Sequence, residues 1–423
     1  MFVRMLLAAA ALPLANVAWA APLTLEQAVA FAQRANPALR SAQAGLAALD
    51  GQLKDSRALL FNNPELSGEF GARRAPQQGL PDQRTREWAL GVSQTFEIAG
   101  QAGFRRSAAE SDLAAAHESI AEASLKLRAE VEQRFFEVLA LKERIANETL
   151  AIKVIEDVTT VIRKRVTAGE DAKLDGNLAE VEAERARSQM LALREQLSQA
   201  SAELGTVLQW PAAEPLEVTG NVYAAATQYS LPQLLSQYER RPQFRALELK
   251  ELAARNRLEL ERAAAKPDIT LGVSAAREGP GDMRERVFGF TVSVPLPLFR
   301  QNAGGIGRAS SELTQANIER QAAARDARAQ VLGLWDRHLL LRERVERLQR
   351  DSLPRLTENE RLIERSLQLG EIGIVQFLLA SRQALEGRKD LLESLAAYHA
   401  NRVALEYVSG WHATTSPKPG TEK

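Results

Sequence analysis

Two pairs of segments alternate hydrophobic and polar residues with the period of two that is typical of a β-strand with one apolar face. The first pair covers residues 65–73 and 86–96, and the second covers 268–275 and 288–296. We therefore predict two β-hairpins, over about 65–96 and 268–297. The apolar side carries Leu66, Phe70, Trp88, Leu90, Val92, Ile269, Leu271, Val273, Phe288, Phe290 and Val292. The polar side carries Glu65, Glu69, Arg73, Glu87 and Asp268.

The predicted strands are about nine to eleven residues long, which is enough to cross a bilayer when a strand is tilted. Such alternation is shared by outer-membrane barrels, which face apolar residues to lipid and polar residues to the lumen, and by soluble hairpins that pack one face on a core. In lipid, four strands cannot leave their edges open, because unpaired N–H and C=O groups are costly there. The chain would then share its sheet with other copies. Two copies give eight strands with a filled interior, and three give twelve with room for a passage.

Beyond the hairpins the hydrophobic pattern takes the period of a helix. Residues 102–168 contain no proline, and hydrophobic residues between Val131 and Val166 recur with the heptad spacing of helix-on-helix packing. At 1.5 Å per residue this helix would be roughly 100 Å long. A matching helix is predicted at about 306–369, where Pro354 should cause a kink or a local break.

Shorter helices are predicted at about 172–208, 242–266 and 374–408. The first two of these together are about as long as one long helix. We therefore expect the first long helix to run from the strands to a tight turn at Gly169, and the two shorter helices to run end to end back to the strands. Gly370 makes the corresponding turn in the second half.

The two halves of the chain repeat each other at an offset of about 200 residues. The pair Asn36-Pro37 corresponds to Arg241-Pro242, and each half has the order helix, two strands, very long helix, tight turn and helix. We predict one structural repeat over 21–210 and a second over 233–411. A connector at mid-height, 211–232, joins them, and a disordered tail, 412–423, follows.

Residues 1–20 have the pattern of a secretory signal peptide, with Arg4, an apolar stretch and the small-residue site Ala18-Trp19-Ala20. The chain has no cysteine, so lipid attachment to a cysteine after cleavage is excluded and we do not expect a lipoprotein. No later apolar run reaches the length of a membrane-spanning helix. We expect an exported protein that begins at Ala21.

Charge and motifs exclude several classes of function. The 54 basic residues balance the 54 acidic ones, whereas a nucleic-acid binder usually has a basic excess, so we expect no nucleic-acid partner. The motifs of zinc proteases, serine hydrolases and P-loop enzymes are absent. The four histidines lack zinc-ligand spacing, and His338 fits a helix-packing position. We predict no catalytic residue, no bound metal and no cofactor.

The two tight turns contain acidic residues, three in the first and one in the second. They read RVTAGEDAKLD over 165–175 and RSLQLGEIGIV over 365–375. We predict that Gly169 and Gly370 end their helices in the left-handed conformation. The acidic residues are Glu170, Asp171, Asp175 and Glu371. In one interpretation Glu170, Asp171 and Glu371 start the ascending helices, where carboxylates suit the helix dipole. In the other, Glu170, Asp171 and Asp175, repeated by symmetry and with Glu371 as a further candidate, form an acidic ring that favours cations at the periplasmic mouth of an oligomeric channel.

The whole layout resembles the outer membrane factor (TolC-type) family of efflux channels. The opening LTLEQAVAFAQRANPALRSA, residues 23–42, is similar to the start of that family, as is the strand-to-helix turn at 294–302. The segment QTFEIAGQ, residues 94–101, followed by Arg105, resembles a turn of the CzcC-like heavy-metal (cobalt-zinc-cadmium) subgroup. Ala99 and Gln101 stand where that subgroup more usually has glycine and lysine.

This resemblance implies a mainly α fold with a small β part. It implies a trimeric α-helical periplasmic barrel of long coiled-coil helices, continuous with a 12-stranded outer-membrane β-barrel that takes four strands from each protomer. The implied location is the outer membrane of a Gram-negative bacterium, in contact with its lipid. The implied partners are a periplasmic adaptor (membrane fusion) protein, docking at the turns of Gly169 and Gly370, and an inner-membrane RND pump.

The function that we expect is a passive exit duct of a tripartite efflux system. Its cargo would be divalent heavy-metal cations such as Co, Zn and Cd. Multidrug efflux and type I protein secretion are alternatives within the same class. A non-channel periplasmic coiled-coil protein is the alternative of another class.

Overall fold

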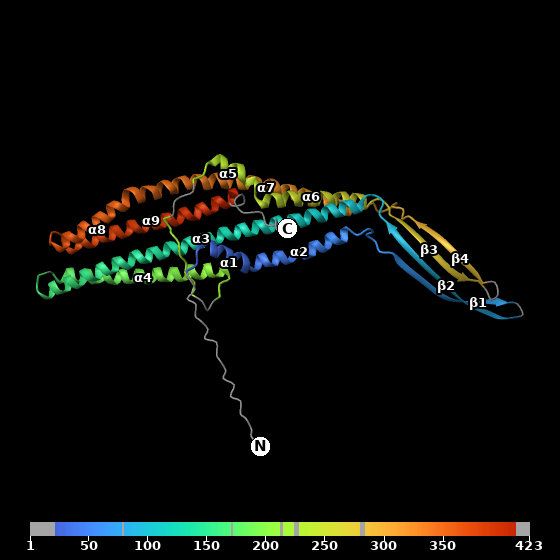
Figure 1. Cartoon of the computed structure of the whole chain (residues 1–423), viewed down its shortest axis with the longest axis horizontal. Helices are drawn as coiled ribbons and strands as arrows, with labels where there is room; N and C mark the ends of the chain where they lie inside the picture. The colour runs from blue at the N-terminus through green and yellow to red at the C-terminus, as the bar shows by residue number, and fades with distance from the viewer. Residues whose placement is uncertain are drawn as a thin grey trace, which may run out of the picture. The chain divides into compact units, whose positions relative to one another are not determined.

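The computed structural model describes residues 22–77, 80–170, 172–211, 215–223, 228–279 and 284–411. The predicted signal peptide, the predicted disordered tail and Asp171 lie outside these ranges. As predicted, the described chain is mainly helical with a small antiparallel sheet (Figure 1). It divides into two compact units, and three helices contribute residues to both: α3 (Gln101–Thr167), α7 (Ala303–Arg347) and α9 (Ile374–Ser409).

One unit, formed by Asn36–Ala129, Thr227–Leu340 and Asn401–Lys423, holds the sheet. Its strands lie side by side in sequence order: β1 (Glu65–Gln77), β2 (Leu80–Phe96), β3 (Ile269–Glu278) and β4 (Glu285–Ser293). At 13 and 17 residues, β1 and β2 exceed the predicted length, because their pairing continues past the apolar alternation to Gln77 and Leu80. Strand β4 ends before the predicted Leu296, because Pro295 and Pro297 have no N–H to extend the ladder.

The helices of this unit lead into and out of the strands. Helix α2 (Pro37–Ser56) precedes β1, and α6 (Pro242–Ala263) precedes β3. The Asn36 side chain caps α2 by accepting hydrogen bonds from two backbone N–H groups at 2.9 and 3.1 Å. Helix α5 (Leu231–Gln237) and a 3₁₀ turn precede α6. The core of the unit includes Leu234, Phe244, Val331 and Leu405.

The other unit is built from helices. It contains α1 (Leu25–Ala35), α4 (Lys173–Leu208) and α8 (Leu353–Gln368), together with the remaining parts of α3, α7 and α9. Helices α3 and α4 form one hairpin, and α8 and α9 form another (Figure 1). The two hairpins share a buried cluster of Ile162, Ala179, Ile374 and Phe377.

The second long helix is interrupted where the proline predicted a break. A π-helical turn, Leu348–Ser352, separates α7 from α8, and Pro354 lies in the first turn of α8. A proline has no N–H to donate to the preceding turn, so the hydrogen-bond pattern shifts around it. With this interruption, the order helix, two strands, long helix and return helix occurs twice in the described chain.

Candidate functional site

The sheet has one apolar face and one polar face. The register sets Leu66 opposite Val92, and Val92 opposite Val273. The apolar residues predicted from the alternation therefore share one face. In the single chain Ile269 is half-buried and the other side chains of this set are exposed, for example Phe70 at 78% and Phe288 at 81%. An apolar face of this kind normally marks an interaction surface.

Both edges of the sheet are open within the described residues. Strands β1 and β4 each have a neighbour on one side only. Because the strands are antiparallel, β1 and β4 also run in opposite directions. The β4 edge of one copy therefore matches the β1 edge of another in direction, and their free backbone groups can pair.

The charged residues on the opposite face of the sheet are mainly acidic. The register places Glu65, Glu69 and Glu87 on it, together with Arg73. Arg73 Nε lies 2.9 Å from Glu87 Oε1, which also accepts a hydrogen bond from the backbone N–H of Gly279 at 3.1 Å. Glu65 and Glu69 are exposed, so carboxylates are accessible on this face of the sheet.

A polar cluster joins the sheet to helix α3. Arg105 makes a two-bond ion pair with Glu97, at 3.0 and 2.5 Å, and its guanidinium lies 3.5 Å from the centre of the Phe61 ring. Gln101 Nε2 donates to Asp268 Oδ1 at 2.8 Å. Burial, aided by the charge of Glu97, raises the pKa of the Asp268 carboxyl. Asp268 was predicted on the polar face of a strand, and it lies instead at this junction, one residue before β3.

The two tight turns share one backbone geometry. Gly169 and Gly370 have φ angles of +79° and +74°, in the left-handed region as predicted. The N–H of Glu170 donates to the carbonyl of Arg165, and the N–H of Glu371 donates to that of Ser366, both at 2.9 Å. These are the bonds of a Schellman motif, which satisfies carbonyls at a helix end.

One interpretation of the sequence has the acidic residues of the turns start the ascending helices. In the structure Glu170 and Glu371 do not. Glu170 and Glu371 belong to the ends of the descending helices, because α4 begins at Lys173 and α9 at Ile374. Glu170 Oε2 lies 3.7 Å from Arg165 Nε, and Glu371 accepts a hydrogen bond from the Ser366 hydroxyl at 2.9 Å. Asp175 lies in the first turn of α4, and the N-cap, Ala172, makes no side-chain cap.

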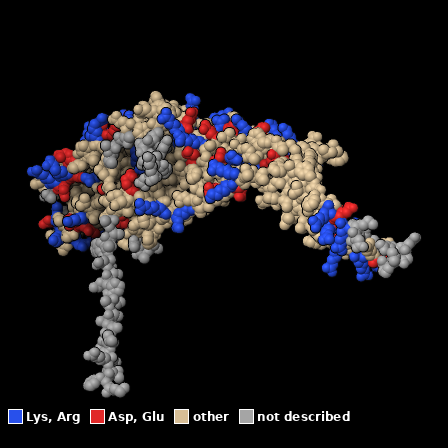
Figure 2. Space-filling model, turned by 45° about the vertical axis from the view of Figure 1, so that its right-hand side comes forward, with Lys and Arg blue, Asp and Glu red and all other residues tan. Residues whose placement is uncertain are grey.

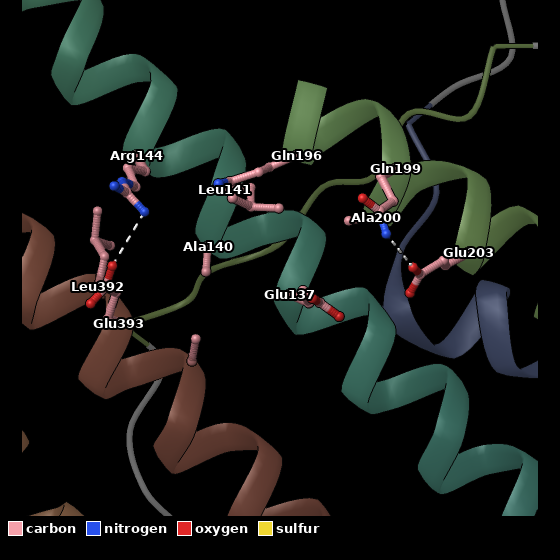
Figure 3. A pocket seen from close by; sticks show the side chains of 11 residues that line it. Glu137, Ala140, Leu141, Arg144, Gln196, Gln199, Ala200, Glu203, Leu392 and Glu393 are labelled. Atoms are coloured by element: carbon pink, nitrogen blue, oxygen red, sulfur yellow. Dashed lines mark hydrogen bonds and ion pairs between the residues drawn. The ribbon is translucent and has the colours of Figure 1, made fainter. Parts of the chain in front are cut away.

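A hollow of about 280 Å³ lies between α3, α4 and α9 in the helical unit (Figure 3). Two pairs of its polar side chains interact across or along its walls. Arg144 Nη1 lies 3.3 Å from Glu393 Oε1, and Gln199 Nε2 donates to Glu203 Oε1 at 3.1 Å.

A buried ion pair with a tyrosine beside it was not predicted from the sequence. Arg241 is 3% exposed and pairs with Glu122, and the Tyr407 hydroxyl donates to Glu122 Oε1 at 2.8 Å. Burial and the charge of Glu122 raise the pKa of Tyr407 to about 12. The repeat pattern singles out Arg241-Pro242, but it cannot identify partners more than a hundred residues away.

The described residues contain no group of three His, Asp or Glu side chains that could hold a metal ion. His338 is buried at 1% exposure beside Trp335 and Tyr229, as its helix-packing position predicts. Each of the described helices is too short or too polar to cross a membrane.

Comparison with known proteins identifies the family. The family model described as "Outer membrane efflux protein" matches residues 30–208 and 234–410. The chain belongs to this family. This outer membrane efflux protein is therefore a transport protein and not an enzyme, and the two matched segments each cover one helix–hairpin–helix half.

Several proteins are similar over most of the length of this outer membrane efflux protein. "Cobalt-zinc-cadmium resistance protein CzcC" of Cupriavidus metallidurans is 25% identical, covering 92% of this chain and 91% of its own. "Nickel and cobalt resistance protein CnrC" of the same organism is 27% identical, covering 71% and 72%. The crystal structure of CusC has the same fold, with a TM-score of 0.71, 19% identity and 91% of each chain covered.

Proposed function

We propose that this protein is the outer-membrane exit duct of a tripartite RND-type efflux system, and that three copies form the duct. The observation that carries the proposal is a four-stranded sheet with two open edges and an exposed apolar face. Three such sheets joined edge to edge give a closed 12-stranded barrel, with the apolar face towards lipid and the acidic face towards the lumen. The long helices of the three copies then form a periplasmic barrel.

The cargo in this proposal is divalent heavy-metal cations. Support comes from the relatives whose names state resistance to cobalt, zinc, cadmium and nickel. The acidic face of the sheet agrees with cation passage, because carboxylates lining a pore favour cations. The duct conducts passively, so it needs no tight metal site.

The partners in this proposal are a periplasmic adaptor and an inner-membrane RND pump. The adaptor docks at the turns of Gly169 and Gly370, which share one geometry and end two hairpins that pack together. In this proposal residues 1–20 act as an export leader.

Deletion of the gene in its own host tests the cargo. We expect lower tolerance of cobalt, zinc and cadmium salts, restored by the wild-type gene, with unchanged tolerance of dyes and antibiotics. The matched control is a deletion of the partner pump, which should reproduce the same pattern. Loss of drug tolerance with normal metal tolerance would contradict the proposal and indicate a multidrug duct.

The acidic turn residues Glu170, Asp171, Asp175 and Glu371 form a cation-favouring ring at the periplasmic mouth of the trimer. Neutralising all four, with Gln for Glu and Asn for Asp, should lower the cation-to-anion permeability ratio in planar bilayers, because the ring loses its negative charge. The control replaces Glu184 and Glu386 with Gln, since these exposed carboxylates lie on α4 and α9 farther from the two turns. Equal selectivity in the wild type and the four-fold variant would remove the ring from the mechanism.

A further inference from the structure

Charged residues at the far end of the sheet, away from the helices, are separated by face. Five arginines lie on the same face as the apolar residues, because they continue its alternation along the four strands. We name them the arginine band: Arg74, Arg84, Arg86, Arg277 and Arg286. All five are exposed. Figure 2 shows basic side chains gathered over this end of the sheet.

The other face of the same end has the opposite charge. Glu278 lies opposite Glu285 there, and Glu87 lies on the same face. The basic residue on that face is Arg73, which is paired with Glu87. A tip that only needed solubility would mix both signs on both faces, so the separation indicates that the two faces meet different surroundings.

The arginine band is unfavourable for the isolated sheet. Arg74 lies directly opposite Arg84, and Arg277 lies directly opposite Arg286. Like charges in such cross-strand positions destabilise a sheet. Within the described strands the acidic residue on this face is Asp82, which pairs with Arg74. The arrangement is therefore incomplete without anions from outside the chain.

Aromatic residues lie directly beside the band. Phe70 is opposite Trp88, and Trp88 is opposite Arg277, while Phe288 follows Arg286 by two positions. Aromatic side chains of membrane proteins gather where acyl chains meet headgroups. The arginine band begins beside these aromatic residues and extends away from the apolar residues. In a membrane, the phosphates of the lipid headgroups lie on that side of the aromatic residues.

We propose that the arginine band binds the phosphate groups of an anionic glycolipid in the outer leaflet. Guanidinium groups bind phosphate oxygens in pairs of hydrogen bonds, and the adjoining apolar face receives the acyl chains of the same molecule. A nucleic acid or an acidic protein would match the arginines but not the apolar face continuous with them. The inference rests on the proposed function, because it requires this face to lie in lipid.

The test uses full-length protein purified in detergent, with diphosphorylated lipid A as the probe. A variant with R84Q, R86Q, R277Q and R286Q is compared with a control in which four exposed helical arginines are changed, R185Q, R194Q, R337Q and R344Q. Lipid retention is measured by native mass spectrometry, and affinity by fluorescence titration. We expect the band variant to lose about fivefold in affinity for each arginine removed, and the control to bind like the wild type.

Two further probes identify the source of the phosphate. Lipid A without its phosphates, with the same acyl chains, should bind the wild type as weakly as lipid A binds the band variant. Inorganic phosphate should not compete at millimolar concentration. Equal binding of both lipids by the wild type would overturn the proposal even if the band variant failed to fold, and so would effective competition by inorganic phosphate.

The oligomeric state separates this inference from the proposed function. A band variant that stays trimeric and conducts ions but binds lipid A normally overturns the lipid site alone. A wild-type protein that forms no trimer in detergent overturns the proposed function and the lipid site together.

Discussion

Single residues determine where the helix hairpins turn. Gly169 and Gly370 have positive φ angles, and a Cβ added at either would meet open space. Backbone conformation therefore requires glycine at these positions, and packing does not. The sequence predicts this well, because a glycine that ends a long helical pattern is a local signal.

Substitution at the first turn should act through that backbone conformation. The left-handed region costs a non-glycine residue about 1–2 kcal/mol, and less for Asn. We expect Gly169→Ala to speed hydrogen exchange in residues 165–176 by about 5- to 30-fold, with Gly169→Asn intermediate. Exchange measured by mass spectrometry checks this. Equal exchange in the wild type and the alanine variant would show that the turn is not held in this conformation.

At the scale of the strands, the alternation predicts which residues share a face because the period of two is a local property. The lengths of β1 and β2 are less predictable, since their outer ends carry arginines where the apolar pattern stops. The role of Asp268 is also hidden in the sequence. Its partner Gln101 is 167 positions away, and only the pairing of β2 with β3 brings the two together.

The open strand edges predict a specific cross-link between copies. The natural chain has no cysteine, so Ser67→Cys in β1 can be combined in turn with cysteine at Gly289, Thr291 or Ser293 in β4. We expect at least one combination to give covalent dimers and trimers on oxidation, because β1 of one copy pairs with β4 of the next.

The control for this cross-link is Thr95→Cys with Thr270→Cys. The hydroxyl oxygens of these residues lie 2.9 Å apart on β2 and β3 of one chain. This pair should join within the chain and migrate as a monomer. Monomers from all three β1–β4 combinations, with the control joined, would contradict edge pairing.

At the scale of the whole molecule, the order of elements and the family follow from the sequence, because the alternation, the long helical patterns and the repeat are each visible along the chain. Neither the number of copies nor the cargo can be derived from one chain. The open edges require further copies in lipid, but four strands per chain are compatible with more than one closed ring. The buried group of Arg241, Glu122 and Tyr407 also needs the folded structure, because it joins three distant segments.

The shared sheet is tested most directly by the mass of the detergent-purified protein, measured by light scattering with the detergent contribution removed. The proposed duct predicts particles that contain three copies of the 46.5 kDa chain, less any leader removed. A single chain that stays in solution without detergent would contradict it.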